Sequence, residues 1–193
     1  MLAAILVCGA IVFTACSSND DNPFQPVVQV GIDKTNFPDD NFWNYLLEQD
    51  YGKDGVLTEA EIRNITVMDV SEKEIKSLKG IEYFTALDSL DCSVNELTTL
   101  DVSKNTALNV LTCCGNQISG QNMDDLISGL PQHDTSDPNF FGVYNNSKGD
   151  EGNVCTKSQV AAAKAKGWLP KYLHEYEEEG EIEVEWLEYE GND

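Results

Sequence analysis

The chain has 193 residues, a length typical of one domain or of one domain with appendages. Its 34 Asp and Glu residues against 12 Lys and Arg residues give a formal net charge of −22 at pH 7. A chain this acidic repels phosphate backbones and anionic lipid surfaces, which argues against nucleic acid as a partner. The charge fits cations or a basic partner, although a high net charge also serves solubility alone.

The first fifteen residues form an uncharged segment that is too short to span a bilayer as a helix. Their apolar run, MLAAILVCGAIVFTA, fits a secretory signal peptide over residues 1–15. The order Phe13-Thr14-Ala15-Cys16 resembles the lipobox of bacterial lipoproteins, which implies cleavage before Cys16 and lipidation of that cysteine. We therefore expect a flexible tether over residues 16–30 and a location at the outer membrane or cell surface. An ordinary signal peptide or membrane anchor is the alternative.

Residues 31–64 predict a helix, a loop and a short helix. The loop DYGKDGVLTEAE, residues 50–61, resembles the calcium loop of an EF-hand. The matching positions are Asp50, Asp54, Val56 through its carbonyl, Thr58 and Glu61. Gly52 stands where that loop usually carries a third carboxylate or amide, and Thr58 with Glu61 also forms a capping box that begins a helix without metal. A calcium site and a metal-free structural role both stay open.

Residues 65–119 contain a repeat. LDSLDCSVNEL, residues 87–97, returns as LNVLTCCGNQI, residues 108–118, and this spacing of leucine and asparagine is the signature of leucine-rich repeats. A degenerate earlier unit fits upstream at Ile65, Met68, Val70, Lys73 and Ile75. One unit cannot bury its own apolar face, so we expect about three units with parallel strands stacked around a shared core.

Strand alternation assigns two sets of side chains in the repeats. Leu90, Cys92, Leu111 and Cys113 are expected to point inward, with the cysteines as small buried thiols rather than a disulfide or metal pair. Asn95 and Asn116 are expected to turn the chain and to bond neighbouring turns. The candidate binding residues on the outward, concave face are Asp69, Ser89, Asp91, Ser93, Thr112 and Cys114, the last as an exposed thiol.

The helix pair, the degenerate loop and IKSLKGIEYFTAL, residues 75–87, together resemble the N-terminal region of internalin-type proteins. In that family an EF-hand-like helix pair is fused directly to short leucine-rich repeats and covers the first of them. The resemblance runs from about residue 32 to residue 119 and implies a structural cap over residues 31–64.

Residues 120–193 predict a C-terminal α+β cap. We expect a short helix at 122–130, a strand at 140–144, a helix from Thr156 to Gly167 and a terminal hairpin built from residues 168–172 and EIEVEWLEY. The capping box of Thr156 and Gln159 begins the second helix. In EIEVEW, Ile182, Val184 and Trp186 alternate with glutamates, so that one face packs and the glutamates oppose edge-to-edge pairing. A metal site on this glutamate row and a sugar-stacking patch of aromatic rings are alternatives.

The predicted fold class is α/β: a short leucine-rich-repeat solenoid with an N-terminal helical cap and a C-terminal α+β cap. The predicted function is a lipid-anchored scaffold outside the cytoplasm that recognises a protein or glycan at the cell surface. The alternative is a calcium-binding surface protein whose EF-hand-like loop orders the cap. No enzyme and no cofactor besides calcium is expected, because His133 and His174 both lie outside the repeats and leave Cys114 without a base.

Overall fold

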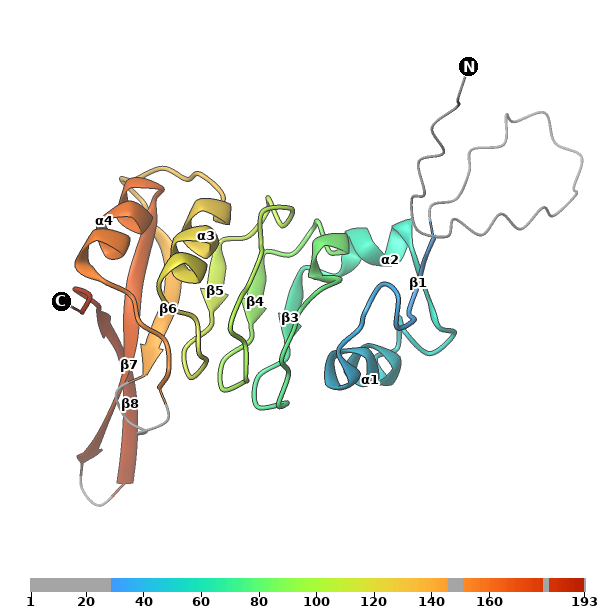
Figure 1. Cartoon of the computed structure of the whole chain (residues 1–193), viewed down its shortest axis with the longest axis horizontal. Helices are drawn as coiled ribbons and strands as arrows, with labels where there is room; N and C mark the ends of the chain where they lie inside the picture. Colours follow the sequence, from blue (N-terminus) through green and yellow to red (C-terminus); the bar gives the residue numbers. More distant parts are fainter. Residues whose placement is uncertain (1–28, 146–150, 179–180, 193) are drawn as a thin grey trace, which may run out of the picture.

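The computed structural model describes residues 29–145, 151–178 and 181–192 (Figure 1). The expected signal peptide, Cys16 and nearly all of the expected tether lie outside these residues. Within them, no helix has the length and apolar character needed to cross a membrane. The described chain forms a row of strands, with the N-terminal helices at one end and a long hairpin at the other.

A six-stranded sheet organises the molecule, in the order β3-β4-β5-β6-β7-β8. The first five strands run parallel and β8 returns antiparallel to β7. Met68 pairs with Leu90 and Leu90 with Leu111, which are the registers that the repeat in the sequence requires. The strands are β3 Val67–Asp69, β4 Ser89–Asp91, β5 Val110–Thr112, β6 Asn139–Asn145, β7 Trp168–Glu178 and β8 Glu181–Glu188. The parallel strands predicted from the repeats are therefore confirmed.

The N-terminal residues fold as a small unit against β3. Strand β1, Gln29–Gly31, pairs antiparallel with β2, Val56–Thr58, and helices α1, Asp40–Glu48, and α2, Glu59–Asn64, flank them. One carboxylate, that of Asp39, joins this unit to the repeats. Its Oδ1 accepts the N–H groups that begin α1, and its Oδ2 accepts the N–H groups of Lys76 and Ser77 at 2.9 and 3.1 Å.

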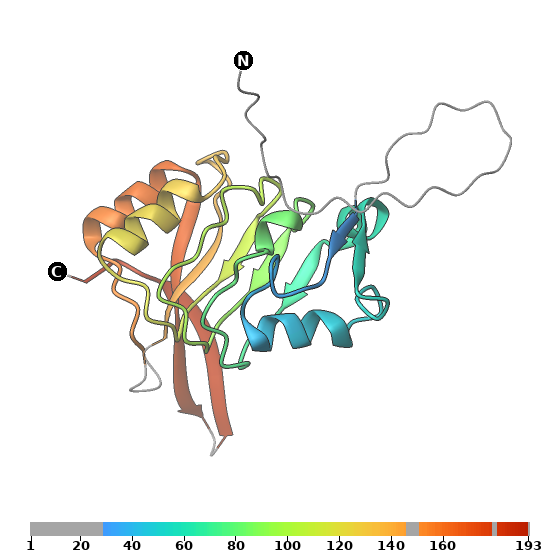
Figure 2. The ribbon, with the colours of Figure 1, turned by 45° about the vertical axis from the view of Figure 1, so that its right-hand side comes forward.

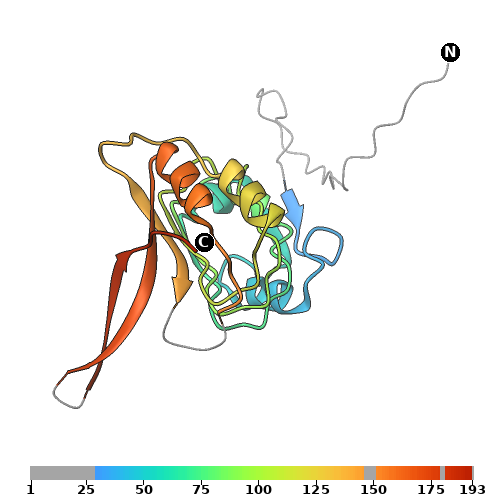
Figure 3. The same cartoon turned by 60° about the vertical axis from the view of Figure 1, so that its left-hand side comes forward.

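Short helices lie on the side of the sheet opposite the concave face (Figure 2). They are η1, Ile81–Tyr83, α3, Gln121–Gly129, and α4, Lys157–Ala165. Figure 3 shows α3 and α4 side by side, and each of them crosses between two neighbouring parallel strands. The capping box of Thr156 and Gln159 is confirmed, and so is the terminal hairpin, whose first strand is longer than expected.

The inward side chains of the repeats form one continuous core with those of both ends of the chain. Leu90, Cys92, Leu111 and Cys113 are completely buried, as strand alternation predicted. Burying one such aliphatic side chain stabilises the fold by roughly 1.5–3 kcal/mol relative to leaving it in water. The core also takes in Phe37 from the N-terminal unit and Trp168 from β7.

Three buried asparagines connect successive turns of the chain. Asn95 and Asn116 both donate to the carbonyl of Cys92, at 3.0 and 2.9 Å, and Asn116 and Asn153 both donate to the carbonyl of Cys113, at 2.9 and 2.8 Å. Each side-chain oxygen accepts a backbone N–H from the preceding turn, those of Ile75, Leu97 and Ile118. The predicted bonds of Asn95 and Asn116 are confirmed, and Asn153 extends the series beyond the repeat visible in the sequence.

The residue just before the turn position of each sequence repeat unit, which is Lys73, Asn95 or Asn116, lies in the left-handed region. Glu72, Val94 and Gly115 occupy equivalent places, with φ of 55°, 53° and 68°. Glycine adopts this conformation freely, whereas a β-branched residue there costs roughly 1–2 kcal/mol. Val94 is therefore a strained position in the second repeat unit.

Candidate functional site

The concave face begins as an open surface on β3 and β4. Val67 is 68% exposed, Asp69 is exposed, and Ser89 and Asp91 are half-buried. The carboxylate of Asp91 accepts from the backbone N–H and the hydroxyl of Ser93, at 2.9 and 2.6 Å. Asp69 makes the same pair of bonds to Ser71, and its bond from that hydroxyl lowers the pKa of the Asp69 carboxyl. This part of the face therefore presents fixed negative charges beside an apolar side chain.

On β5 the same face is partly covered, because Trp186 at the base of the C-terminal hairpin packs over the neighbouring strand β6. Trp186 of β8 packs edge-on against Phe140 of β6, with ring centroids 5.1 Å apart. Gly142 permits this packing, since a Cβ there would lie 3.0 Å from the indole and 3.1 Å from the Thr112 methyl. Thr112 is accordingly only 8% exposed, so it is a minor part of the open surface.

The predicted exposure of Cys114 is wrong. Cys114 is 2% exposed, because residues after β6 pack on the turn that follows it. There Glu151 accepts the N–H of Gly115 at 2.8 Å. Burial, and then the charges of Glu151 and Asp91, raise the pKa of the Cys114 thiol to about 12. The thiol is thus protonated at neutral pH and is not a nucleophile on the concave face.

The other described cysteines are also buried and free. Burial raises the pKa of both Cys92 and Cys113, and the Cys92 thiol donates to the carbonyl of Thr112 at 3.4 Å. The ring of His133 is engaged in packing: its Nε2 lies 2.8 Å from the Leu108 carbonyl and it contacts the Trp168 ring at 5.2 Å. These groups act as packing residues.

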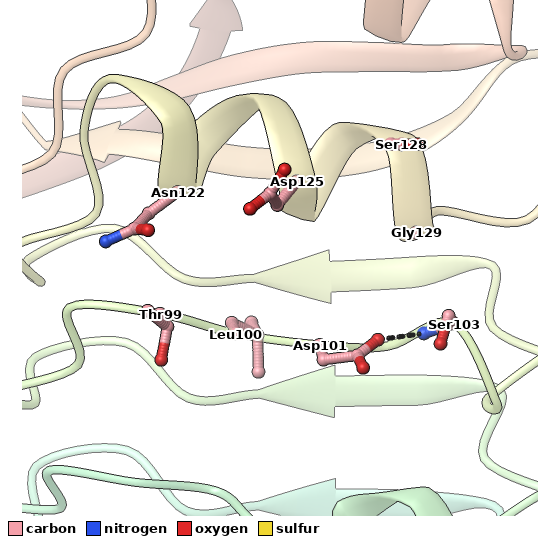
Figure 4. A pocket seen from close by; sticks show the side chains of 8 residues that line it. All are labelled: Thr99, Leu100, Asp101, Ser103, Asn122, Asp125, Ser128 and Gly129. Carbon is pink, nitrogen blue, oxygen red and sulfur yellow. Dashed lines mark hydrogen bonds between the residues drawn. The ribbon is translucent and has the colours of Figure 1, made fainter.

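A hollow of about 450 Å³ lies on the opposite side, between residues 99–103 and α3 (Figure 4). Its lining combines Asp101 and Asp125 with hydroxyl, amide and backbone groups. Asp101 is bonded to the N–H of Ser103 at 2.9 Å, and Asn122 donates to the Thr98 carbonyl at 3.0 Å. The lining holds neither histidine nor cysteine.

The predicted calcium residues do not converge in this conformation. Asp50 is exposed and pairs with Lys53, while Oδ1 of Asp54 accepts the N–H of Val56 at 3.0 Å. The Glu61 carboxylate is occupied by the capping box, where it accepts the N–H and the hydroxyl of Thr58, both at 2.8 Å. The capping box of Thr58 and Glu61 is therefore present in the structure.

Gly52 stands where an EF-hand loop usually carries its third ligand, and the fold leaves no room for a side chain there. A Cβ at Gly52 would lie 1.8 Å from the carbonyl oxygen of Leu46, so that position has no room for any side chain. Over residues 29–145, 151–178 and 181–192, no three His, Cys, Asp or Glu side chains are grouped so as to hold a metal ion.

One comparison with known proteins finds an internalin. No protein-family model matches the chain. Internalin J of Listeria monocytogenes serotype 4b (strain F2365) is 35% identical over 71 residues, which is 36% of this chain and 8% of that protein. The chain is a distant relative of an internalin. It spans less than a tenth of that protein's length.

A solved structure of the functional domain of InlJ from Listeria monocytogenes, described as including a cysteine ladder, also aligns with the chain. The alignment covers 65% of this chain and 29% of that chain, with 26% sequence identity and a TM-score of 0.43.

The part of the concave face on β6 and β7 was missing from the sequence prediction. Phe140 and Leu169 continue the row that begins at Val67, because Val110 pairs with Phe140 and Phe140 with Leu169. The strand signal of FFGVY was visible, but its pairing with β5 was not. Only that pairing places Phe140 beside the repeats.

Proposed function

We propose that the chain is a short leucine-rich-repeat solenoid, closed at its ends by residues 31–64 and 120–193, that binds a protein or glycan through its concave face. The observation that carries the proposal is the open row of side chains on β3 and β4, where Val67 is 68% exposed and Asp69 and Asp91 present carboxylates. Helices α3 and α4 lie on the other side of the sheet (Figure 3), and Tyr45 of α1 lies beside Asp69 at one edge of the row. An exposed apolar side chain with charged neighbours on a rigid sheet suits recognition rather than catalysis.

The size of the face sets an expectation for affinity. With about three repeat strands, and with β5 partly covered by Trp186, the interface lies at the low end of specific interfaces, near 1,200 Å² of total buried area. A modest affinity follows, unless the partner also contacts the C-terminal hairpin.

We propose a location at the bacterial cell surface, held by a lipid on Cys16 after removal of residues 1–15. The lipobox-like order Phe13-Thr14-Ala15-Cys16 and the distant relation to an internalin support it. Growth with a clickable fatty acid should label the wild-type chain, and Cys16→Ala should lose both the label and the membrane fraction. Label retained in Cys16→Ala would contradict the anchor.

The binding proposal is tested by capturing a partner from envelope or host-surface extracts with the full chain and measuring its affinity. Replacing both Asp69 and Asp91 with alanine should weaken binding about five-fold or more, since each contributes a charge on the proposed contact surface.

The matched control replaces Asp101 and Asp134 with alanine. These residues also bond the N–H of a serine two positions later, at 2.9 and 2.8 Å, but lie outside the concave face. The control changes the net charge and the local turns equally, so equal losses in both double variants would refute the concave face as the binding surface.

A further inference from the structure

Beyond the sheet the C-terminal hairpin continues as a two-stranded arm, described here by residues 174–178 and 181–185. Strand β6 pairs with β7 only as far as Leu173, whereas β7 continues to pair with β8 from His174 to Glu178. Figures 1 and 3 show the two strands projecting away from the body. A two-stranded ribbon has little core of its own, so both of its faces are available to a partner.

One face of the arm carries a row of rings. Tyr172, His174 and Tyr176 alternate along β7, with centroid distances of 6.2 and 5.9 Å between neighbours. The row begins in the body at Tyr189, which lies 6.4 Å from Tyr172. Exposure rises outward, from 7% at Tyr189 to 37% at Tyr176. The inner ring of Tyr189 belongs to the core, and the outer ring of Tyr176 is exposed.

Glutamates on β8 flank the same rings. Glu185 pairs with His174 and Glu183 with Tyr176, and directly opposed residues project to the same face. The arm contains no lysine or arginine. The ion pairs of the hairpin in the described part of the chain lie at its base, where Lys164 contacts Glu188. The exposed rings therefore lie among carboxylates that no Lys or Arg of the arm neutralises.

We propose that this aromatic and acidic face of the arm binds an extended segment of a protein in which lysine or arginine recurs at every second residue. A cation lies favourably over an aromatic ring, and a carboxylate beside the ring adds an ion pair. Alternate residues of an extended chain are roughly 6.5–7 Å apart, close to the ring spacing on β7. This surface is separate from the concave face and adds a partner class to the proposed function.

The charge of the arm selects against other occupants. A second copy of the chain would place glutamates opposite glutamates, which destabilises a paired sheet. Nucleic acids and acidic polysaccharides carry the same sign as the arm. A neutral glycan could stack on the rings without using the carboxylates, and the experiment includes it as an opposing outcome.

The test is fluorescence anisotropy of a labelled nonapeptide with Lys at every second position, titrated with the full chain. We expect saturable binding that weakens as NaCl rises, and no binding of the peptide with Glu in place of Lys. The pair Glu183→Gln and Glu185→Gln should weaken binding about five- to ten-fold, and Tyr176→Ala about three- to five-fold.

The control pair is Glu175→Gln and Glu177→Gln, which removes the same charge from the opposite face of the arm, where Glu175 is paired with Val184. It should leave affinity within about two-fold of wild type. Equal weakening by both pairs would show non-specific attraction and overturn the proposal. So would absence of peptide binding, or binding of a neutral oligosaccharide that depends on Tyr176 alone.

The concave-face variants separate this proposal from the proposed function. Asp69→Ala with Asp91→Ala should leave peptide affinity unchanged. If that pair abolishes peptide binding and the arm variants do not, the concave face binds the basic segment and the arm proposal fails while the proposed function stands.

Discussion

Asn116→Ala tests the hydrogen bonds that join successive turns of the chain. The side chain of Asn116 is 1% exposed and makes three short bonds: it donates to the carbonyls of Cys92 and Cys113, both at 2.9 Å, and accepts the N–H of Leu97 at 3.0 Å. Alanine removes all three. Each carbonyl keeps a second asparagine donor, so losing those two bonds costs about 1 kcal/mol each.

The N–H of Leu97 is the larger part of the loss. Leu97 is completely buried, and its N–H would have no acceptor, which costs about 1–3 kcal/mol. The sum is a fall of about 3–5 kcal/mol in the free energy of unfolding. This is a large share of the roughly 5–15 kcal/mol of a typical domain.

Urea unfolding of the full chain, followed by circular dichroism, measures this change. Asn44→Ala, at an exposed position of α1, is the control and should shift stability by less than about 0.5 kcal/mol. A loss below about 1 kcal/mol for Asn116→Ala would refute the reasoning, because a water or a relaxed turn would then satisfy Leu97.

Four further outcomes are expected. Val94→Asn should raise the free energy of unfolding by about 0.5–1 kcal/mol, because asparagine tolerates the left-handed conformation better than valine; a fall would show that Val94 is not strained. Gly80→Ala should lower the free energy of unfolding by about 2–3 kcal/mol, because its Cβ would lie 2.2 Å from the Phe37 ring. Gly120 also has a positive φ but lies in open space, so Gly120→Ala should lower it by only about 1 kcal/mol. Similar losses in the two variants would show that the contact with Phe37 does not matter. Millimolar CaCl₂ should leave the melting temperature unchanged, and a rise that Glu61→Gln abolishes would establish the calcium site instead. The thiols of Cys92, Cys113, Cys114 and Cys155 should react with iodoacetamide only when the chain unfolds, and fast labelling of the native chain would contradict their burial.

The repeat region was the most predictable part of the fold. Leucine, cysteine and asparagine recur there at the offsets of leucine-rich repeats, so the inward set and the asparagine bonds could be stated in advance, whereas the outward set was right for Asp69 and wrong for Cys114. Capping boxes were equally readable, because Thr58 with Glu61 and Thr156 with Gln159 act within a single turn.

Long-range pairing was harder to predict. Nothing local to FFGVY indicates that Phe140 pairs with Val110, or that Asn153 continues the bonds of Asn116 after an intervening helix. Strand alternation also gave the wrong environment for Cys114, since it says which way a side chain points but not which later segment covers it.

The calcium loop shows a different limit. Its letters match an EF-hand at several positions, yet the match does not reveal that the carbonyl of Leu46 occupies the space of a side chain at Gly52. Nor does it reveal whether Glu61 caps the helix or turns toward the loop. The space at Gly52 and the direction of the Glu61 side chain both depend on the path of the chain in three dimensions, which residue spacing alone does not determine.

Hydrogen–deuterium exchange of the full chain, with and without the captured partner, tests most directly the claim that one open sheet face binds that partner. We predict slower exchange at residues 66–71 and 88–93, around β3 and β4, and no change at residues 99–104 or in α3 on the opposite side. Protection confined to that opposite side, with β3 and β4 unaffected, would contradict the account.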